Sequence, residues 1–79
     1  MTNDQKLERA FIDGLQLPPG IYSDELRYET IPQWDSTGHM ALIVEIEKQF
    51  DVMLGMEDII DMSSVAKTKQ ILARHHIQF

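Results

Sequence analysis

The chain has 79 residues, with thirteen acidic against seven basic side chains, a formal net charge of −6 and no cysteine. This size fits one small domain spanning residues 1–79, whose single core leaves a net stability of only about 3 to 5 kcal/mol, so an elaborate buried active site is not expected. The acidic balance argues against nucleic-acid binding, which needs clustered basic side chains, and the absence of cysteine excludes disulfides and thiolate metal ligands. No apolar run approaches the roughly 20 residues that cross a bilayer, and the polar first residues lack a signal-peptide hydrophobic region, so we expect a cytoplasmic protein without a membrane partner.

A first helix is predicted over about residues 4–15. Either Asn3 or Asp4 can cap it, because a short polar side chain accepts hydrogen bonds from the free amides of a helix start. Gly14 is expected to weaken the last turn, since glycine is a poor helix former. The apolar residues that recur at helical spacing are Leu7, Ala10, Phe11 and Leu15.

A long loop is predicted to follow this helix. The run Leu17-Pro18-Pro19-Gly20 ends the helix, because proline lacks an amide donor and restricts the residue before it. Residues 21–33 show no sustained period, and a loop of this length in a small domain needs packing of its own or a function. We expect three of its residues to reach the core, namely Leu26, Tyr28 and Ile31.

The second helix is predicted to begin at Ser36, with Asp35 as its N-cap, and to end near residue 50. Its core face follows from helical spacing and comprises Leu42, Ile43, Ile46 and Phe50. Residues 51–55 indicate a turn. Residues 56–61 indicate a short third helix that directs one of two isoleucines inward, Ile59 or Ile60.

A last helix is predicted after Ser63, which can act as its cap. Its core residues are Val65, Ile71 and Leu72, and its C-terminal end, where positive charge is favoured, carries Arg74, His75 and His76. The two adjacent histidines point in different directions on a helix, so they do not form a metal-binding pair and no metal site is expected. Together these elements predict an all-α fold, a four-helix bundle with a long loop between the first and second helices and a short third helix.

Ser36 is the residue best placed to carry chemistry. A free serine hydroxyl is a weak nucleophile that needs a base and oxyanion donors, and the sequence has no Gly-x-Ser-x-Gly elbow. A hydrolase is therefore disfavoured, although spacing alone does not exclude a triad. The plain structural alternative is a serine that only assists the helix cap. A modification site asks for less, because an exposed hydroxyl on a fixed backbone suffices and the positive end of a helix suits a phosphodiester.

The stretch from Ile31 to Val65 resembles the acyl carrier protein family. The resemblance begins with the pair Asp35-Ser36 and with Trp34 before it. It continues in a following helix that ends in the family's usual Glu and Phe, here Glu47 and Phe50, and in the acidic and apolar segment of residues 58–65. One departure is Thr37, where the family most often has leucine or methionine, and this difference bears on how well a generic modifying enzyme grips the chain.

The resemblance implies that a phosphopantetheinyl transferase attaches 4′-phosphopantetheine from coenzyme A to Ser36, with Asp35 in a supporting role. The thiol of this arm would hold acyl groups as thioesters for fatty-acid-like or polyketide-like biosynthesis. The chain itself would be a monomeric carrier with no catalytic residues of its own. Its partners would be acyl-loading and acyl-processing enzymes with basic docking patches.

The outer face of the second helix is the predicted contact surface for those partners. Residues 35–61 hold seven acids and one base, which gives this segment a net charge of −6. The candidate contact residues are Thr37, Met40, Ala41, Val44 and Glu47. The competing interpretation is an ordinary solvated surface, because single exposed apolar residues are common.

Two aromatic side chains near Ser36 have structural interpretations. Trp34 is predicted to pack beneath the loop and fix the turn before Ser36, in preference to standing exposed as a docking aromatic. His39 is predicted to be a partly buried helix residue. Two other functions stay open beside the leading one: a carrier for aminoacyl or peptidyl groups, disfavoured because Trp-Asp-Ser differs from the Gly-Gly-His-Ser form common in peptidyl carriers, and an unmodified helical adaptor.

Overall fold

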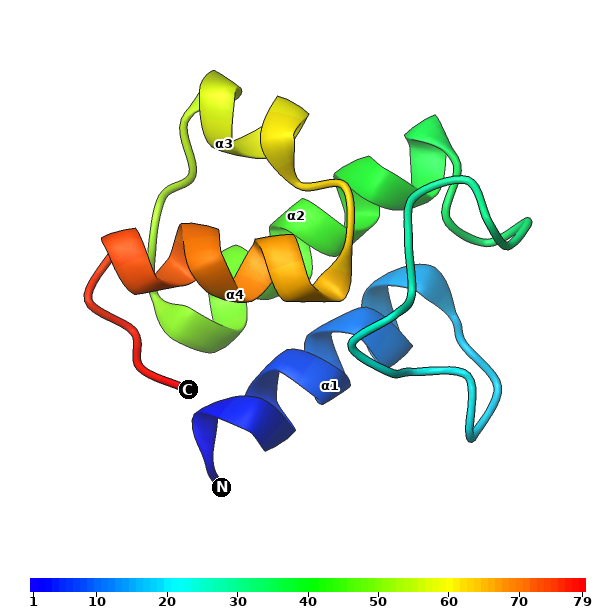
Figure 1. Cartoon of the computed structure of the whole chain (residues 1–79), viewed down its shortest axis with the longest axis horizontal. Helices are drawn as coiled ribbons and strands as arrows, with labels where there is room; N and C mark the ends of the chain where they lie inside the picture. Colours follow the sequence, from blue (N-terminus) through cyan, green and yellow to red (C-terminus); the bar gives the residue numbers. More distant parts are fainter.

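The computed structural model describes residues 1–79 and contains four helices and no strand, an arrangement compatible with a helical bundle (Figure 1). The helices are α1 (Asn3–Leu15), α2 (Ser36–Phe50), α3 (Met56–Asp61) and α4 (Val65–Arg74). The predicted all-α class is confirmed, and α2 begins and ends where the sequence predicted. None of the four helices combines the length and the apolar character that crossing a membrane requires.

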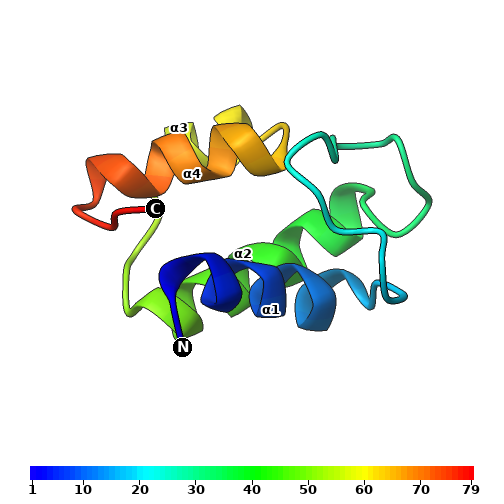
Figure 2. The ribbon, with the colours of Figure 1, turned by 60° about the horizontal axis from the view of Figure 1, so that its bottom comes forward.

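The helices lie in two layers around one core. Helix α1 packs along α2, and α3 and α4 lie on the opposite side of the molecule (Figure 2). The segment between α1 and α2 spans one end of both layers, and Leu26 of this segment is buried while Tyr28 and Ile31 are half-buried against the core, as predicted. The largest fully buried side chains come from all parts of the chain and include Leu7, Phe11, Trp34, Leu42, Ile46, Met62, Ile71 and Leu72.

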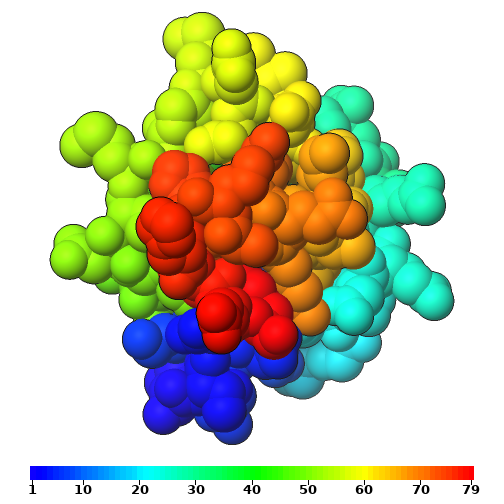
Figure 3. All heavy atoms as spheres, turned by 60° about the vertical axis from the view of Figure 1, so that its left-hand side comes forward, coloured from blue at the N-terminus to red at the C-terminus, as the bar shows by residue number.

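The two ends of the chain meet on one face. Residues after α4 lie between that helix and the first turn of α1 (Figure 3), and the Asn3 side-chain amide donates to the Gln78 carbonyl at 2.9 Å. Lys69 of α4 reaches both Asp4 (3.0 Å) and Asp24 (2.8 Å). These contacts raise the pKa of Lys69, chiefly through its hydrogen bond with Asp24, and they join α4 to α1 and to the loop.

The caps of two helices differ from the prediction by one residue. Thr2, and neither Asn3 nor Asp4, caps α1: its hydroxyl accepts from the Gln5 amide at 3.1 Å while the Gln5 side chain accepts from the Thr2 amide at 2.8 Å. This reciprocal capping box satisfies two free amides at once, which a lone Asn or Asp cannot do. Helix α4 is capped by Ser64, whose hydroxyl accepts from the Lys67 amide at 2.9 Å.

The core prediction needs one correction, at Phe50, and the choice it left open in α3 falls to Ile59. Phe50, at the last turn of α2, is only half-buried and packs against Phe79 with ring centroids 6.1 Å apart. Of the two isoleucines of α3, Ile59 is half-buried and packs on the core, whereas Ile60 is 73% exposed. Four buried residues outside the predicted set complete the interior: Leu17, Leu54, Met62 and Thr68.

Candidate functional site

Ser36 is the first residue of α2 and its side chain is exposed. The cap of the helix is made by the residue before it: the Asp35 carboxylate accepts from the Gly38 amide at 2.8 Å, and the Asp35 carbonyl accepts from the His39 amide at 2.8 Å. Because Asp35 performs the capping, the Ser36 hydroxyl is not needed for it. The site therefore presents a hydroxyl to solvent at the end of a helix where free amides and the helix dipole favour negative charge.

The backbone before Ser36 is anchored in the core by Trp34. The indole is fully buried, as predicted, and packs edge-on against Phe11 with ring centroids 5.2 Å apart. The Trp34 carbonyl accepts from the Glu29 amide at 2.9 Å, and its amide donates to the Ile31 carbonyl at 3.2 Å. This tight turn, closed by local hydrogen bonds and an aromatic anchor, fixes the direction from which the chain enters α2.

Gly38 allows the loop to lie directly on the first turn of α2. A Cβ at this position would overlap the carbonyl oxygen of Gln33 and would lie 3.3 Å from a carboxylate oxygen of Asp35. Any side chain here would push the loop away from the helix start and disturb the cap. This requirement was not predicted, because a helical glycine gives no local sign of what approaches it.

His39 joins three segments beside the site. The Trp34 indole N–H donates to His39 Nδ1 at 2.9 Å, and His39 Nε2 lies 2.8 Å from the carbonyl oxygen of Ile59 in α3. The His39 and Trp34 rings are nearly parallel, at 18° with centroids 6.2 Å apart. The predicted partly buried position of His39 is confirmed. Its two hydrogen bonds were not predicted, because their partners lie five residues before and twenty residues after it in the chain.

The outer face of α2 exposes four of the five predicted contact residues. Met40 and Val44 are 55% and 54% exposed, and Thr37 and Ala41 are also exposed. Glu47 is different, because it is half-buried and its carboxylate accepts from the Leu54 amide at 2.9 Å. Glu47 therefore holds the connection from α2 to α3, a structural role that the sequence did not reveal.

The histidines at the end of α4 are not equivalent. His75 Nε2 lies 2.9 Å from an Asp58 carboxylate oxygen, and Arg74 reaches the other oxygen at 3.4 Å, so the end of α4 is tied to α3. The hydrogen bond with His75 is the main reason that the pKa of Asp58 lies below its ordinary value. His76 is exposed and lies in the left-handed backbone region at φ 67°. The expectation that no metal is bound here stays a prediction.

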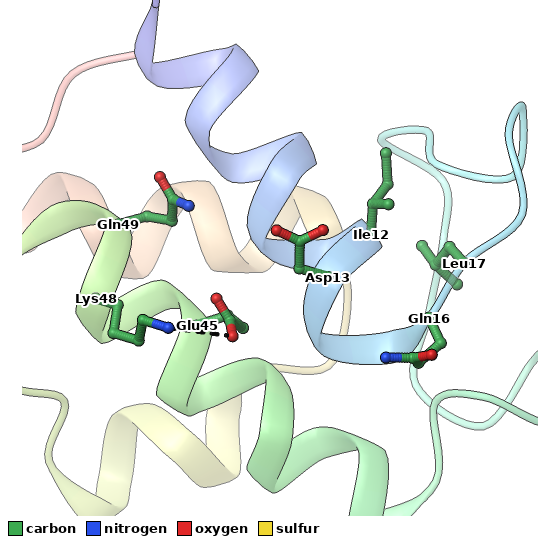
Figure 4. A pocket seen from close by; sticks show the side chains of 7 residues that line it. All are labelled: Ile12, Asp13, Gln16, Leu17, Glu45, Lys48 and Gln49. Carbon is green, nitrogen blue, oxygen red and sulfur yellow. Dashed lines mark ion pairs between the residues drawn. The ribbon is translucent and has the colours of Figure 1, made fainter.

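A hollow of about 600 Å³ lies away from Ser36, in the groove between α1 and the last turns of α2 (Figure 4). Most of its lining is polar, and Glu45 and Lys48 form an ion pair across one side at 3.7 Å. Glu45 follows Ser36 by nine positions, which places it roughly 13 Å further along the helix axis. The groove contains none of the predicted site residues and is open to solvent, so it is a surface depression between two packed helices.

No protein-family model, curated protein or solved structure matches the chain. Its function is therefore argued from its own residues and their geometry.

Proposed function

We propose that this protein is an acyl carrier that holds acyl intermediates on a 4′-phosphopantetheine arm attached to Ser36, for fatty-acid-like or polyketide-like biosynthesis. In this proposal it is a cytoplasmic monomer, its four helices form the carrier bundle, and it catalyses no reaction. The observation that carries the proposal is the position of Ser36, an exposed hydroxyl on the first residue of α2, beside a cap made by Asp35.

The residues around Ser36 fit the arm. The serine is exposed, so a modifying enzyme can reach it, and Trp34 holds the preceding turn in place. The helix start supplies backbone amides and a positive dipole end for the phosphodiester that attachment creates. When bound, the arm would supply the thiol that a chain without cysteine lacks.

Two alternatives are less well supported by the geometry. A serine that only caps the helix is disfavoured, because the carboxylate of Asp35 already accepts from the Gly38 amide. A serine hydrolase needs a free base near Ser36, and the histidine three residues later has both ring nitrogens engaged, one by Trp34 and the other by the Ile59 carbonyl. The unmodified adaptor remains the alternative that experiment must separate.

Mass spectrometry tests the proposal directly. Incubation with coenzyme A and a broad-specificity phosphopantetheinyl transferase should add the mass of one arm to the wild type and none to Ser36→Ala. Ser63→Ala is the matched control and should be modified like the wild type, since Ser63 is an exposed serine that caps no helix. A wild type that stays unmodified with several transferases would favour the adaptor, and a modified Ser36→Ala would place the arm elsewhere.

Thr37 is tested in the same assay. Thr37→Leu introduces a residue that is frequent after the serine in acyl carrier proteins, and it should be modified at least as fast as the wild type, because Thr37 is exposed. A markedly slower Thr37→Leu would mean that the threonine is itself recognised by the enzyme.

The outer face of α2 is proposed to steer partner enzymes through Glu47, the one acidic residue among its predicted contacts. Glu47 needs a variant that separates its charge from its hydrogen bond. Glu47→Gln removes the charge and keeps an oxygen that can accept from the Leu54 amide. It should slow arm transfer by lowering the association rate, and its rate should depend less on salt, because rim charges act mainly on encounter. Glu8→Gln makes the same change in net charge on α1. Equal slowing by Glu8→Gln would assign the effect to overall charge and remove α2 as the recognised surface.

A further inference from the structure

We propose that His39 is the positioning residue of the Ser36 site: a neutral imidazole with its hydrogen on Nε2 that fastens Trp34 and α3 to the first turn of α2, and that releases Trp34 when Nδ1 takes a proton. The positioning of Ser36 rests on the proposed function. The hydrogen-bonded state of the ring does not, and the two can be tested separately.

The partners of His39 fix its tautomer. The indole N–H of Trp34 can only donate, so Nδ1 of His39, 2.9 Å away, must accept and carry no hydrogen. The carbonyl of Ile59 can only accept, so Nε2, 2.8 Å away, must carry the hydrogen and donate. Only the neutral Nε2–H form satisfies both contacts. In the protonated ring two N–H groups would face each other between Trp34 and His39.

The crevice beside His39 brings no acidic side chain to the ring. The crevice of about 210 Å³ beside the ring is lined by Tyr28 from the loop, by Ile59 and Ile60 from α3, and by Met62 and Ser63 after it. Tyr28 is the only titratable group among them, and its ring packs on the imidazole with centroids 5.3 Å apart. On its own helix, the nearest carboxylate in sequence is that of Asp35, which accepts from the Gly38 amide. No carboxylate lines the crevice to stabilise a charged imidazole.

The contacts of the His39 ring connect it to the turn that presents Ser36. One side of the ring holds Trp34, which precedes the cap residue Asp35, and the other side holds α3. Helix α3 has six residues, none of them buried, so it depends on such contacts for its place. A proton on Nδ1 opposes only the bond to Trp34 and leaves the Nε2 bond to α3. Protonation therefore loosens the turn that presents Ser36 while α3 stays docked.

Nuclear magnetic resonance of the ¹⁵N-labelled wild type tests the hydrogen-bonded state without any variant. At neutral pH the His39 nitrogens should show the Nε2–H pattern, and a scalar coupling should connect Trp34 Nε1 with His39 Nδ1 across the hydrogen bond. Acidification that places a proton on Nδ1 should abolish that coupling and speed exchange of the indole hydrogen, because the acceptor of the bond is then lost. An Nδ1–H tautomer at neutral pH, or a coupling that survives protonation of His39, would overturn the proposal.

Two substitutions separate the two bonds. Asparagine places its side-chain oxygen near the Nδ1 position, so His39→Asn keeps an uncharged acceptor for Trp34. His39→Phe keeps a ring and removes both bonds. Trp34 is the only tryptophan, so its fluorescence should change with pH in the wild type and remain flat in both variants. His76→Asn, which alters an exposed histidine at the other end of the chain, should retain the wild-type response. A pH response that persists in His39→Asn would overturn the assignment.

The rate of arm transfer to Ser36, measured as a function of pH, tests the positioning role. The transferase has its own pH dependence, so each wild-type rate is divided by that of His39→Asn, whose side chain does not titrate. This ratio should fall several-fold from neutral to acidic pH, through a higher KM at unchanged kcat. If the wild type takes no arm at any pH, the proposed function fails while the spectroscopic result stands. A ratio that stays constant while Trp34 is released would overturn the positioning role alone.

Discussion

Gly14 is the position where the close packing of α1 on α2 can be tested with a single methyl group. Judged from helix propensity alone, Gly14→Ala should stabilise the protein by about 1 kcal/mol, because alanine is the better helix former. The structure predicts the opposite sign. A Cβ on Gly14 would lie 2.8 Å from the Cα of Leu42 and 3.2 Å from its amide nitrogen, and both atoms belong to the backbone of α2.

The magnitude follows from that contact. Carbon atoms in favourable contact are about 3.5 to 4.0 Å apart, so the two helices would have to separate by roughly 0.7 Å. Overpacking of a core costs about 1 to 3 kcal/mol, and a backbone neighbour cannot move aside by changing rotamer, which places Gly14→Ala near the upper end. After the gain in propensity is subtracted, we expect a net loss of about 2 kcal/mol, a large share of a total near 3 to 5 kcal/mol.

Urea unfolding followed by circular dichroism measures this effect. With a slope near 1 kcal/mol/M for a small domain, the loss of about 2 kcal/mol should lower the midpoint for Gly14→Ala by about 2 M. Gly55→Ala is the control without a clash, because a Cβ there meets nothing within 4 Å. Gly55 is the N-cap of α3, where alanine is less favourable than glycine, and this loss opposes the gain from a less flexible unfolded chain. Its midpoint should therefore move much less than that of Gly14→Ala. A midpoint that rises in Gly14→Ala would show that α1 and α2 do not approach as closely as described.

Three further changes test the core and two titrating groups. Leu42→Ala should lower the unfolding free energy by about 2 to 5 kcal/mol in urea melts, because Leu42 is fully buried. Val44→Ala, at an exposed position, should change it by less than about 0.5 kcal/mol. A larger loss in Val44→Ala than in Leu42→Ala would mean that α2 is rotated about its axis. Burial raises the pKa of Tyr22 from 10.0 to about 12, so its contribution to stability is complete below pH 10.0 and is lost as pH rises toward 12. Tyr22→Phe should therefore lose less unfolding free energy than the wild type between pH 10 and 12. An equal loss in both proteins would refute the assignment. The pKa of Asp58 lies below 3.8 because of its hydrogen bond with His75, so its contribution is present above pH 3.8 and is lost as pH falls through the lowered value; Asp58→Asn should be less sensitive to acid than wild type in thermal melts, and equal sensitivity would contradict this role.

The parts of the fold that the sequence predicted are those set by local physics. The start of α2 follows from one short polar side chain that accepts from an amide three residues later, and its end follows from the loss of helical spacing after Phe50. The buried face of α2 follows from the same spacing, because Leu42, Ile43 and Ile46 all lie in the core. Phe50 has the same spacing but is only half-buried, because it lies in the last turn of α2, where the core ends.

Contacts between distant segments could not be predicted in the same way. Glycine is a weak helix former, and it is needed at position 14 only because the backbone of α2 lies too close for a side chain. The same difference between local and distant contacts holds within the candidate site. Asp35 and Ser36 were found from two adjacent residues, whereas Gly38 is required by the carbonyl of Gln33, which touches it only after the loop has folded back.

Helix α3 brings these observations together. It has six residues, none of them fully buried, and Ile59 is its only side chain that packs against the core. Apolar burial and length therefore hold it only weakly. It is held by polar contacts from both neighbouring helices: His39 of α2 at the Ile59 carbonyl, Glu47 of α2 at the connection before it, and His75 after α4 at Asp58. Because the other three helices carry buried residues and α3 carries none, we expect α3 to detach at the lowest free energy of the four.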